Sequence, residues 1–329
     1  MNTQHSFSLC CHAFIRKHGN RRRQCISCLR TWSIYQHKRG RKILRRNYQL
    51  MKRIVLNNEH LNLQKHLLCR LTPNCIAKRF NHSLTTFSTK QRHYPQLVGS
   101  YILLADGIHH SFAGQDWVTY VLLLKPRRRN TSYILDPITL LGKESFTNWQ
   151  TAINTIPVSV QNRIYALVSD NFATSTAITK HYGWLHQLCH FHLIAQLQLR
   201  RGNQKRCLTN RSVREGIYQI IRRLLVTRKD SEIQPLLHIL QTLSNYDICP
   251  RKLSMMAHEF IHKINNYRTY LNNPTLTIPY TNNAVESFNN LIRKRTRCIN
   301  NPESMQQWIL SFVRLKKKIA CNGQRKPQN

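Results

Sequence analysis

Three short apolar runs between residues 100 and 136 constrain the fold of this chain more than any other feature. They read SYILLADGI (100–108), WVTYVLLLKP (117–126) and SYILD (132–136), and turn-like or charged segments separate them. Runs this short and this rich in β-branched and aromatic residues predict three consecutive β-strands. The chain then alternates, with helices expected near 142–156 and 173–182, strands near 163–170 and 184–190, and a long basic helix from about 192.

This order predicts an α/β fold in which a mixed five-stranded sheet is flanked by helices, the order found in ribonuclease H-like proteins. Residues 210–272 show apolar spacings of three and four and no credible strand, so we expect an all-helical insertion there. The α/β domain would then comprise residues 94–209 and 273–329, and its last part would contain two basic helices.

The first 42 residues contain the C-x-x-C pair Cys25 and Cys28 after a basic strand-like run, as in the second half of a zinc ribbon. The first half is irregular, because adjacent cysteines replace a second C-x-x-C pair. Zinc takes four nitrogen or sulfur ligands, so we expect one structural Zn²⁺ bound by Cys25, Cys28, Cys11 and one of Cys10, His12 and His5. A reduced cysteine pair without metal is the alternative.

Residues 43–93 are basic and helical in pattern, with Thr72 expected as an N-cap and Pro73 at the first helical position. Two or three short helices of this kind would suit a DNA-binding helix-turn-helix, and a helical linker fits equally well.

The charge of the chain indicates its partner. Lys and Arg number 51 against 13 Asp and Glu, which gives a formal net charge of +38. Self-repulsion on this scale favours a polyanionic partner, so we expect DNA or RNA rather than a membrane surface. No apolar window or signal pattern predicts membrane insertion or export, so we expect a cytoplasmic protein. We expect phosphate contacts from Arg21, Arg22, Arg23, Lys125, Arg127, Arg128, Arg293, Lys294 and Arg295.

Because acids are scarce, those at strand ends are informative. Asp106 and Asp170 each close an apolar run, and Glu286 lies in the first turn of a predicted helix. If they converge, their mutual repulsion requires a cation, and two Mg²⁺ or Mn²⁺ ions about 3.5 to 4 Å apart would suit phosphoryl transfer. The alternative is that both aspartates merely begin turns. Turns, loops or helix starts account for the remaining acids considered: Asp116, Asp136, Glu144, Asp230, Glu232 and Glu303.

The segments ILLADGIHHSF, YVLLLKP, YILDP, GKESFTNW, ALVSDNF, QLCHFH and TNNAVESFNNLIRKR, in this order, resemble the catalytic region of DDE-type insertion-sequence transposases, in particular the Mutator-like group. The resemblance covers roughly residues 94–318. It implies that Asp106, Asp170 and Glu286 form the catalytic triad and that Cys189 and His192 form a C-x-x-H element beside it. Asn282 and Asn283 match the small polar residues before the glutamate more weakly.

The resemblance further implies Mg²⁺-dependent DNA cleavage and strand transfer at the ends of an insertion element. A dimer or larger assembly would hold two ends together, in bacterial cytoplasm and at the nucleoid when bound to DNA. We expect the C-x-x-H element to position the fifth strand rather than to bind metal. Two other functions remain open: a catalytically inactive DNA-binding protein derived from a transposase, and a structure-specific nuclease of the same fold.

Overall fold

The computed structural model describes residues 15–18, 22–29, 31–33, 48–49, 51–56, 73–89, 99–202, 209–297 and 299–321. The chain divides into two units, Met1–Ser83 and Leu84–Asn329. None of the helices in these described ranges combines the length and apolar character that crossing a membrane requires. Several residues singled out in the sequence lie outside the described ranges, namely His5, Cys10, Cys11, His12, Arg21 and Thr72.

The first unit contains a small antiparallel sheet of β1 (Ile15–Lys17), β2 (Arg22–Cys25) and β3 (Thr31–Ser33). Cys25 is buried at the end of β2, and Cys28 is exposed in the turn that follows. Within the described residues, no third ligand joins these two cysteines in a metal-binding group. The zinc ribbon and the helix-turn-helix therefore stay predictions. Helix α3 (Pro73–Ser88) begins at the proline expected there.

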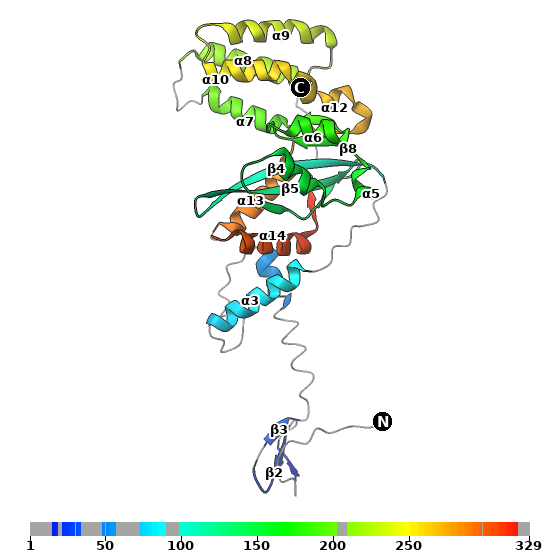
Figure 1. Cartoon of the computed structure of the whole chain (residues 1–329), viewed down its shortest axis with the longest axis vertical. Coiled ribbons are helices and arrows are strands. Elements are labelled where there is room, and N and C mark those ends of the chain that lie inside the picture. The colour runs from blue at the N-terminus through cyan, green and yellow to red at the C-terminus, as the bar shows by residue number, and fades with distance from the viewer. Residues whose placement is uncertain are drawn as a thin grey trace. The chain divides into compact units, whose positions relative to one another are not determined.

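The second unit is built on a seven-stranded mixed sheet with the order β10-β6-β5-β4-β8-β9, in which β7 also pairs with β5. In Figure 1 the sheet is found by the labels of β4, β5 and β8. Strand β4 is antiparallel to β5 and parallel to β8, and β8 is parallel to β9. The strands are β4 (Tyr101–Phe112), β5 (Gln115–Pro126), β6 (Thr131–Ile134), β7 (Ile138–Leu141), β8 (Ile164–Ser169), β9 (Leu185–Leu188) and β10 (Lys318–Ala320).

The mixed sheet confirms the expected α/β class, but the expected number of five strands is wrong. Strands β7 and β10 are short, with four and three residues, and each adds to a strand that is already part of the sheet. Strand β7 forms because β5, with 12 residues, extends past β6. Its second half pairs with β6 and its first half with β7, while β10 adds to the outer edge of β6.

The long β4–β5 hairpin turns at Ala113 and Gly114, whose φ angles are 50° and 77°. Two consecutive positive φ angles match the right-handed twist of the flanking strands, and glycine adopts them without strain. The turn lets β4 run on to Phe112, well beyond the end of its purely apolar segment.

Helices cover both faces of this sheet. Side chains alternate across β4, so Tyr101, Leu103 and Ala105 pack into an apolar core with Trp149 and Phe172. The opposite face, which carries Asp106, is covered by α13. The helices of the first face are α4 (Phe146–Ile153), α5 (Val158–Gln161) and α6 (Ser175–Tyr182), and those of the second face are α13 (Asn283–Thr296) and α14 (Pro302–Lys316).

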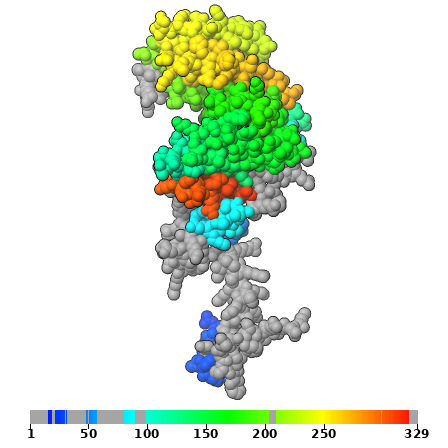
Figure 2. Space-filling view, in the orientation of Figure 1, coloured from blue at the N-terminus to red at the C-terminus, as the bar shows by residue number. Residues whose placement is uncertain are grey.

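A second apolar core lies among the helices between β9 and α13 and includes Leu197, Ile221, Leu240 and Phe260. Figure 2 shows these helices packed as a lobe beside the sheet. The residues from 211 to 276 contain no strand. The elements are α7 (His190–Arg201), α8 (Arg211–Val226), α9 (Asp230–Asn245), α10 (Arg251–His262), α11 (Ile264–Tyr267), α12 (Thr269–Asn272) and the 3₁₀ turn η1 (Pro274–Leu276).

Candidate metal and phosphoryl-transfer site

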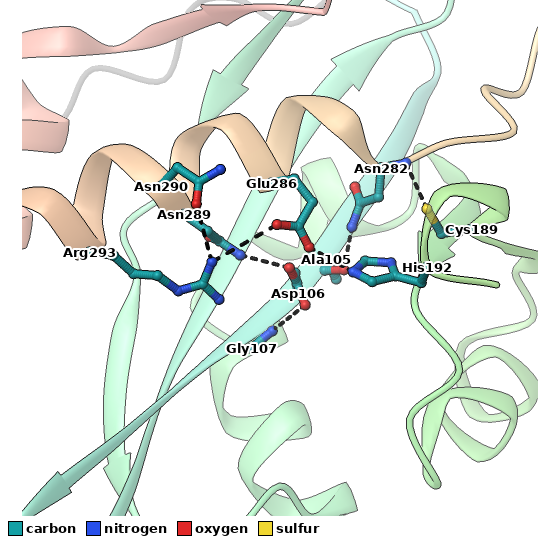
Figure 3. Close-up of polar contacts among 10 residues, drawn as sticks. All are labelled: Ala105, Asp106, Gly107, Cys189, His192, Asn282, Glu286, Asn289, Asn290 and Arg293. Atoms are coloured by element: carbon teal, nitrogen blue, oxygen red, sulfur yellow. Dashed lines mark hydrogen bonds and ion pairs between the residues drawn. The ribbon is translucent and has the colours of Figure 1, made fainter. Parts of the chain in front are cut away.

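Three side chains from three separate elements meet on the α13 face of the sheet. Asp106 comes from the middle of β4, Glu286 from the first turn of α13, and His192 from the first turn of α7. One ligand atom of each lies within 4.8 Å of the others, and in the described part of the chain no other group of three acids, histidines or cysteines is so close. Figure 3 shows all three side chains pointing toward one another.

Asp170 directly follows β8, the strand that pairs with β4. Strands β4 and β8 pair only as far as Leu104 and Val168, so the end of β8 opens beside the continuing backbone of Asp106. The charge of Asp170 contributes to the raised pKa of Asp106, but Asp170 does not belong to the group of three whose ligand atoms lie within 4.8 Å of one another. The Oδ1 atom of Asp170 is buried without a hydrogen-bond partner.

Burial and mutual repulsion govern the charges of this cluster. Burial, followed by the charges of Asp170 and Glu286, raises the pKa of Asp106 to about 8. Burial also raises the pKa of Asp170, whereas the hydrogen bond from His192 lowers that of Glu286. Burial alone would lower the pKa of His192, but the neighbouring Cys189 and Glu286 side chains outweigh it and raise this pKa to about 11.

These residues fit a hard divalent cation. Carboxylate oxygens are the ligands that Mg²⁺ and Mn²⁺ accept, and a cation would relieve the repulsion that raises the pKa of Asp106. His192 Nε2 donates to Glu286 Oε1 at 2.6 Å, so this nitrogen is engaged with the carboxyl group. The carboxylates are the ligands that a hard cation prefers, and His192 holds Glu286 in place.

The C-x-x-H element connects this cluster to the start of α13. Cys189 directly follows β9, where its backbone N–H donates to Ser169 O at 2.8 Å. Its Sγ atom accepts a hydrogen bond from the backbone N–H of Asn282 at 3.1 Å. The Asn282 side chain in turn donates to Ala105 O at 2.8 Å, so β9, α13 and β4 are joined next to the acids (Figure 3).

Asn289 is a site residue that sequence reasoning missed. It is fully buried, and its Nδ2 donates to Asp106 Oδ2 at 2.7 Å, while the backbone N–H of Gly107 donates to the other carboxylate oxygen at 2.9 Å. Asn289 lies three residues after Glu286 and so on the same face of α13. The three-residue spacing from Glu286 could have identified Asn289 as a site residue from the sequence.

Glu144 also lies closer to the acids than its place before α4 suggests. A Cβ atom at Gly107 would be 1.9 Å from Glu144 Oε1, so the carboxyl group occupies the space that only glycine leaves open. Burial, with the Asp170 charge second, raises the pKa of Glu144 to about 7. Its other neighbour is His109, whose Nε2 is 3.8 Å from Glu144 Oε1.

Most of the other acids form ion pairs or lie on the surface. Asp136 pairs with Arg314 at 2.7 Å, and Glu232 pairs with Arg223 at 3.1 Å. Exposed positions are occupied by Asp116, Asp230 and Glu303.

The residues predicted to bind DNA phosphates lie in different environments. Lys125, Arg127 and Arg128 line a common hollow. Arg293 lies 4.0 Å from Glu286 Oε2, beside the acids, and Lys294 is exposed. Arg295 stacks over the Phe312 ring of α14 at 4.3 Å, which gives this residue a packing role. On β2 of the first unit, Arg22 is exposed and Arg23 is partly exposed.

No protein-family model matches the chain, and no curated protein is significantly similar to it.

Proposed function

We propose that this protein is a DDE-type DNA transposase with a ribonuclease H-like domain. It would bind the ends of its insertion element and perform metal-dependent strand cleavage and strand transfer. The observation that carries the proposal is the meeting of Asp106 and Glu286, with Asp170 directly after the neighbouring strand β8, within a chain of net charge +38. A basic surface would hold the polyanion, and a concentrated acidic site would act on it.

Each residue has a role that follows from its contacts. Asp106, Asp170 and Glu286 would hold two Mg²⁺ or Mn²⁺ ions, which when bound supply an activated nucleophile and stabilise the leaving oxygen. His192 keeps Glu286 ionised and oriented through its hydrogen bond. Asn289 and the Gly107 backbone fix both oxygens of Asp106. Arg293, beside Glu286, is positioned to contact a phosphate.

The proposal extends to the whole protein. Strand transfer requires two DNA ends to be held together, so we propose that the active form is a dimer or a higher oligomer. The first 93 residues would recognise the element ends, with one Zn²⁺ bound near Cys25 and Cys28. The protein would act in the bacterial cytoplasm, at the nucleoid.

Substituting Asp170→Asn tests the proposal. With a DNA duplex carrying the sequences that border the gene, the wild type should cleave and join strands in Mg²⁺ or Mn²⁺. The variant should lose activity by about 10²- to 10⁴-fold, because an amide supplies one negative charge less to the cations. The matched control is Asp116→Asn, an exposed acid that should retain activity within about twofold.

The same assay separates the rival functions. DNA binding without cleavage in either metal would indicate an inactive scaffold, and cleavage without joining would indicate a nuclease. Undiminished cleavage by Asp170→Asn protein would remove Asp170 from the site and overturn the triad.

A further inference from the structure

Two hollows flank the acid cluster along β4 and α13. The Lys125 hollow, of about 510 Å³, is lined by Leu104, Lys125, Arg127, Arg128 and the start of α13 at Asn283 and Ala284. The Arg297 hollow, of about 420 Å³, is lined by Ile108, His110, Arg297 and the end of α13 at Arg293 and Thr296. Asp106 lies between them, because Leu104, Asp106 and Ile108 are successive side chains on one face of β4.

Both hollows are rich in positive charge. Among the described residues that line them, none carries a carboxylate. In the same described part of the chain, no acid forms an ion pair with Lys125, Arg127, Arg128 or Arg297. These cations are therefore available to an external anion.

Burial in the Lys125 hollow makes an anion more favourable there. The Lys125 side chain is half-buried, and this desolvation lowers its pKa. The Arg127 guanidinium donates to Thr275 O, while its Nε atom is buried without a partner. A partly desolvated cation without an anionic partner is costly, and a phosphate oxygen would offset that cost.

The spacing of the hollows indicates the size of the ligand. Leu104 and Ile108 are four residues apart on an extended strand, about 14 Å. One strand of B-DNA advances about 3.4 Å per nucleotide along its axis, and the winding backbone places successive phosphates further apart than this, so a strand that reaches both hollows spans at most about four nucleotides. A mononucleotide or a single phosphate would fill only one of them.

We infer that the two hollows hold the phosphates on either side of the reacting phosphodiester, so that the substrate is a continuous DNA strand engaged at an internal bond. This inference rests on the proposed function, because the acids between the hollows define the reacting bond.

Binding of a single-stranded DNA of about 20 nucleotides to the full-length protein, in EDTA, tests the inference without catalysis. Fluorescence anisotropy would give Kd at several salt concentrations for Lys125→Ala, Arg128→Ala and Arg297→Ala proteins. Each should bind about three- to tenfold more weakly, and the slope of log K against log salt should fall by about 0.7 for each phosphate that the protein no longer neutralises. A variant with one substitution in each hollow should show the summed effect.

The matched controls remove the same charge nearby or elsewhere. Arg129→Ala removes the cation next to Arg128 that does not line the Lys125 hollow, and Arg251→Ala removes an exposed cation at the start of α10. Both should stay within about twofold of the wild type. If the controls lose as much affinity as the hollow variants, or if the substitutions in either hollow have no effect, the inference is wrong.

Cys321 provides a local readout, because it lines the Lys125 hollow and is partly exposed. Mass spectrometry of alkylation at Cys321 should show protection by the oligonucleotide in the wild type and in Arg129→Ala protein. Protection should disappear in a Lys125→Ala, Arg128→Ala double variant. Replacing phosphates with neutral methylphosphonates should also abolish it, whereas undiminished protection by the neutral strand would overturn a phosphate site.

The inference and the proposed function can fail separately. If the wild type shows the expected salt dependence of binding and the expected protection of Cys321 but no Mg²⁺-dependent cleavage, the phosphate-binding role of the hollows is supported and the catalytic proposal fails. If cleavage occurs but the hollow variants bind like their controls, the triad stands and the strand path is wrong.

Discussion

At the scale of single residues, the acid cluster is held against electrostatic repulsion. Asp106 is only 5% exposed and has two other carboxyl groups as neighbours, which explains its raised pKa. Hydrogen bonds from Asn289 and Gly107 satisfy both of its oxygens, but neither donor carries a charge. Strongly shifted pKa values of this kind are typical of functional sites.

The stability of the metal-free protein should therefore depend on pH at Asp106. A carboxyl group whose pKa rises on folding binds a proton more tightly in the folded state. The protonated Asp106 carboxyl group therefore stabilises the folded state fully at pH values below its unfolded pKa, near 3.9. This stabilisation is lost as the pH rises toward the folded pKa of about 8. In EDTA, Asp106→Asn should thus raise the Tm relative to wild type at about pH 8 and much less at about pH 5.

Adding Mg²⁺ should reverse this order. The wild type should gain stability, because a ligand that binds only the folded state stabilises it, while Asp106→Asn protein should gain little. Thermal unfolding followed by circular dichroism measures both effects. Equal responses of the two proteins to Mg²⁺ would argue that Asp106 binds no cation.

At the scale of elements, the site depends on how α13 docks on β4. Val285, Phe288 and Ile292 bury the apolar side of the helix, and Phe288 stacks on Phe312 of α14 with ring centroids 5.9 Å apart. Apolar packing is tolerant of small shifts, whereas hydrogen bonds are directional. The bonds from Asn282 to Ala105 and from Asn289 to Asp106 therefore set the position of the helix along the strand.

Asn289→Ala should destabilise the protein by about 1 to 3 kcal/mol, because it leaves a buried carboxylate oxygen without its donor. The control is Asn290→Ala on the same helix, which removes an exposed amide and should cost less than about 0.5 kcal/mol. Urea unfolding in EDTA would measure both. A similar loss for the two variants would contradict a specific role for Asn289 in docking α13.

At the scale of the whole molecule, the net charge of +38 opposes compactness. Ion pairs such as Arg201 with Glu215 and Lys263 with Glu259 can engage only a minority of the 51 cations, because the chain has 13 acids. Most of the positive charge must therefore be neutralised by mobile ions or by a bound polyanion.

Raising NaCl from about 20 to 300 mM should accordingly increase the Tm of the free protein, because screening shortens the range of repulsion from roughly 20 Å to about 6 Å. Bound DNA should raise the Tm further at low salt and less at high salt, because phosphate contacts weaken as salt rises. Differential scanning fluorimetry with and without DNA would measure both. A Tm that falls with added NaCl would contradict dominant self-repulsion.

The sequence by itself determined the order of the main strands and helices, because each of them shows a local pattern of apolar residues. It also placed Asp106 and Asp170 at the ends of apolar runs, and the scarcity of acids made them stand out. Local patterns did not predict β7 and β10, because these short strands depend on hydrogen-bonding groups that β5 and β6 leave free.

Only the tertiary structure decided which side chains meet. His192 and Glu286 are 94 residues apart, and Asp106 and Asn289 are 183 apart, so no local period links them. The hydrogen bond of His192 to Glu286, the burial of Asn289 and the place of Glu144 over Gly107 follow from how α7, α13 and α4 pack on one sheet. Packing between distant segments sets these distances and pKa values, whereas the sequence alone supplies the residue types.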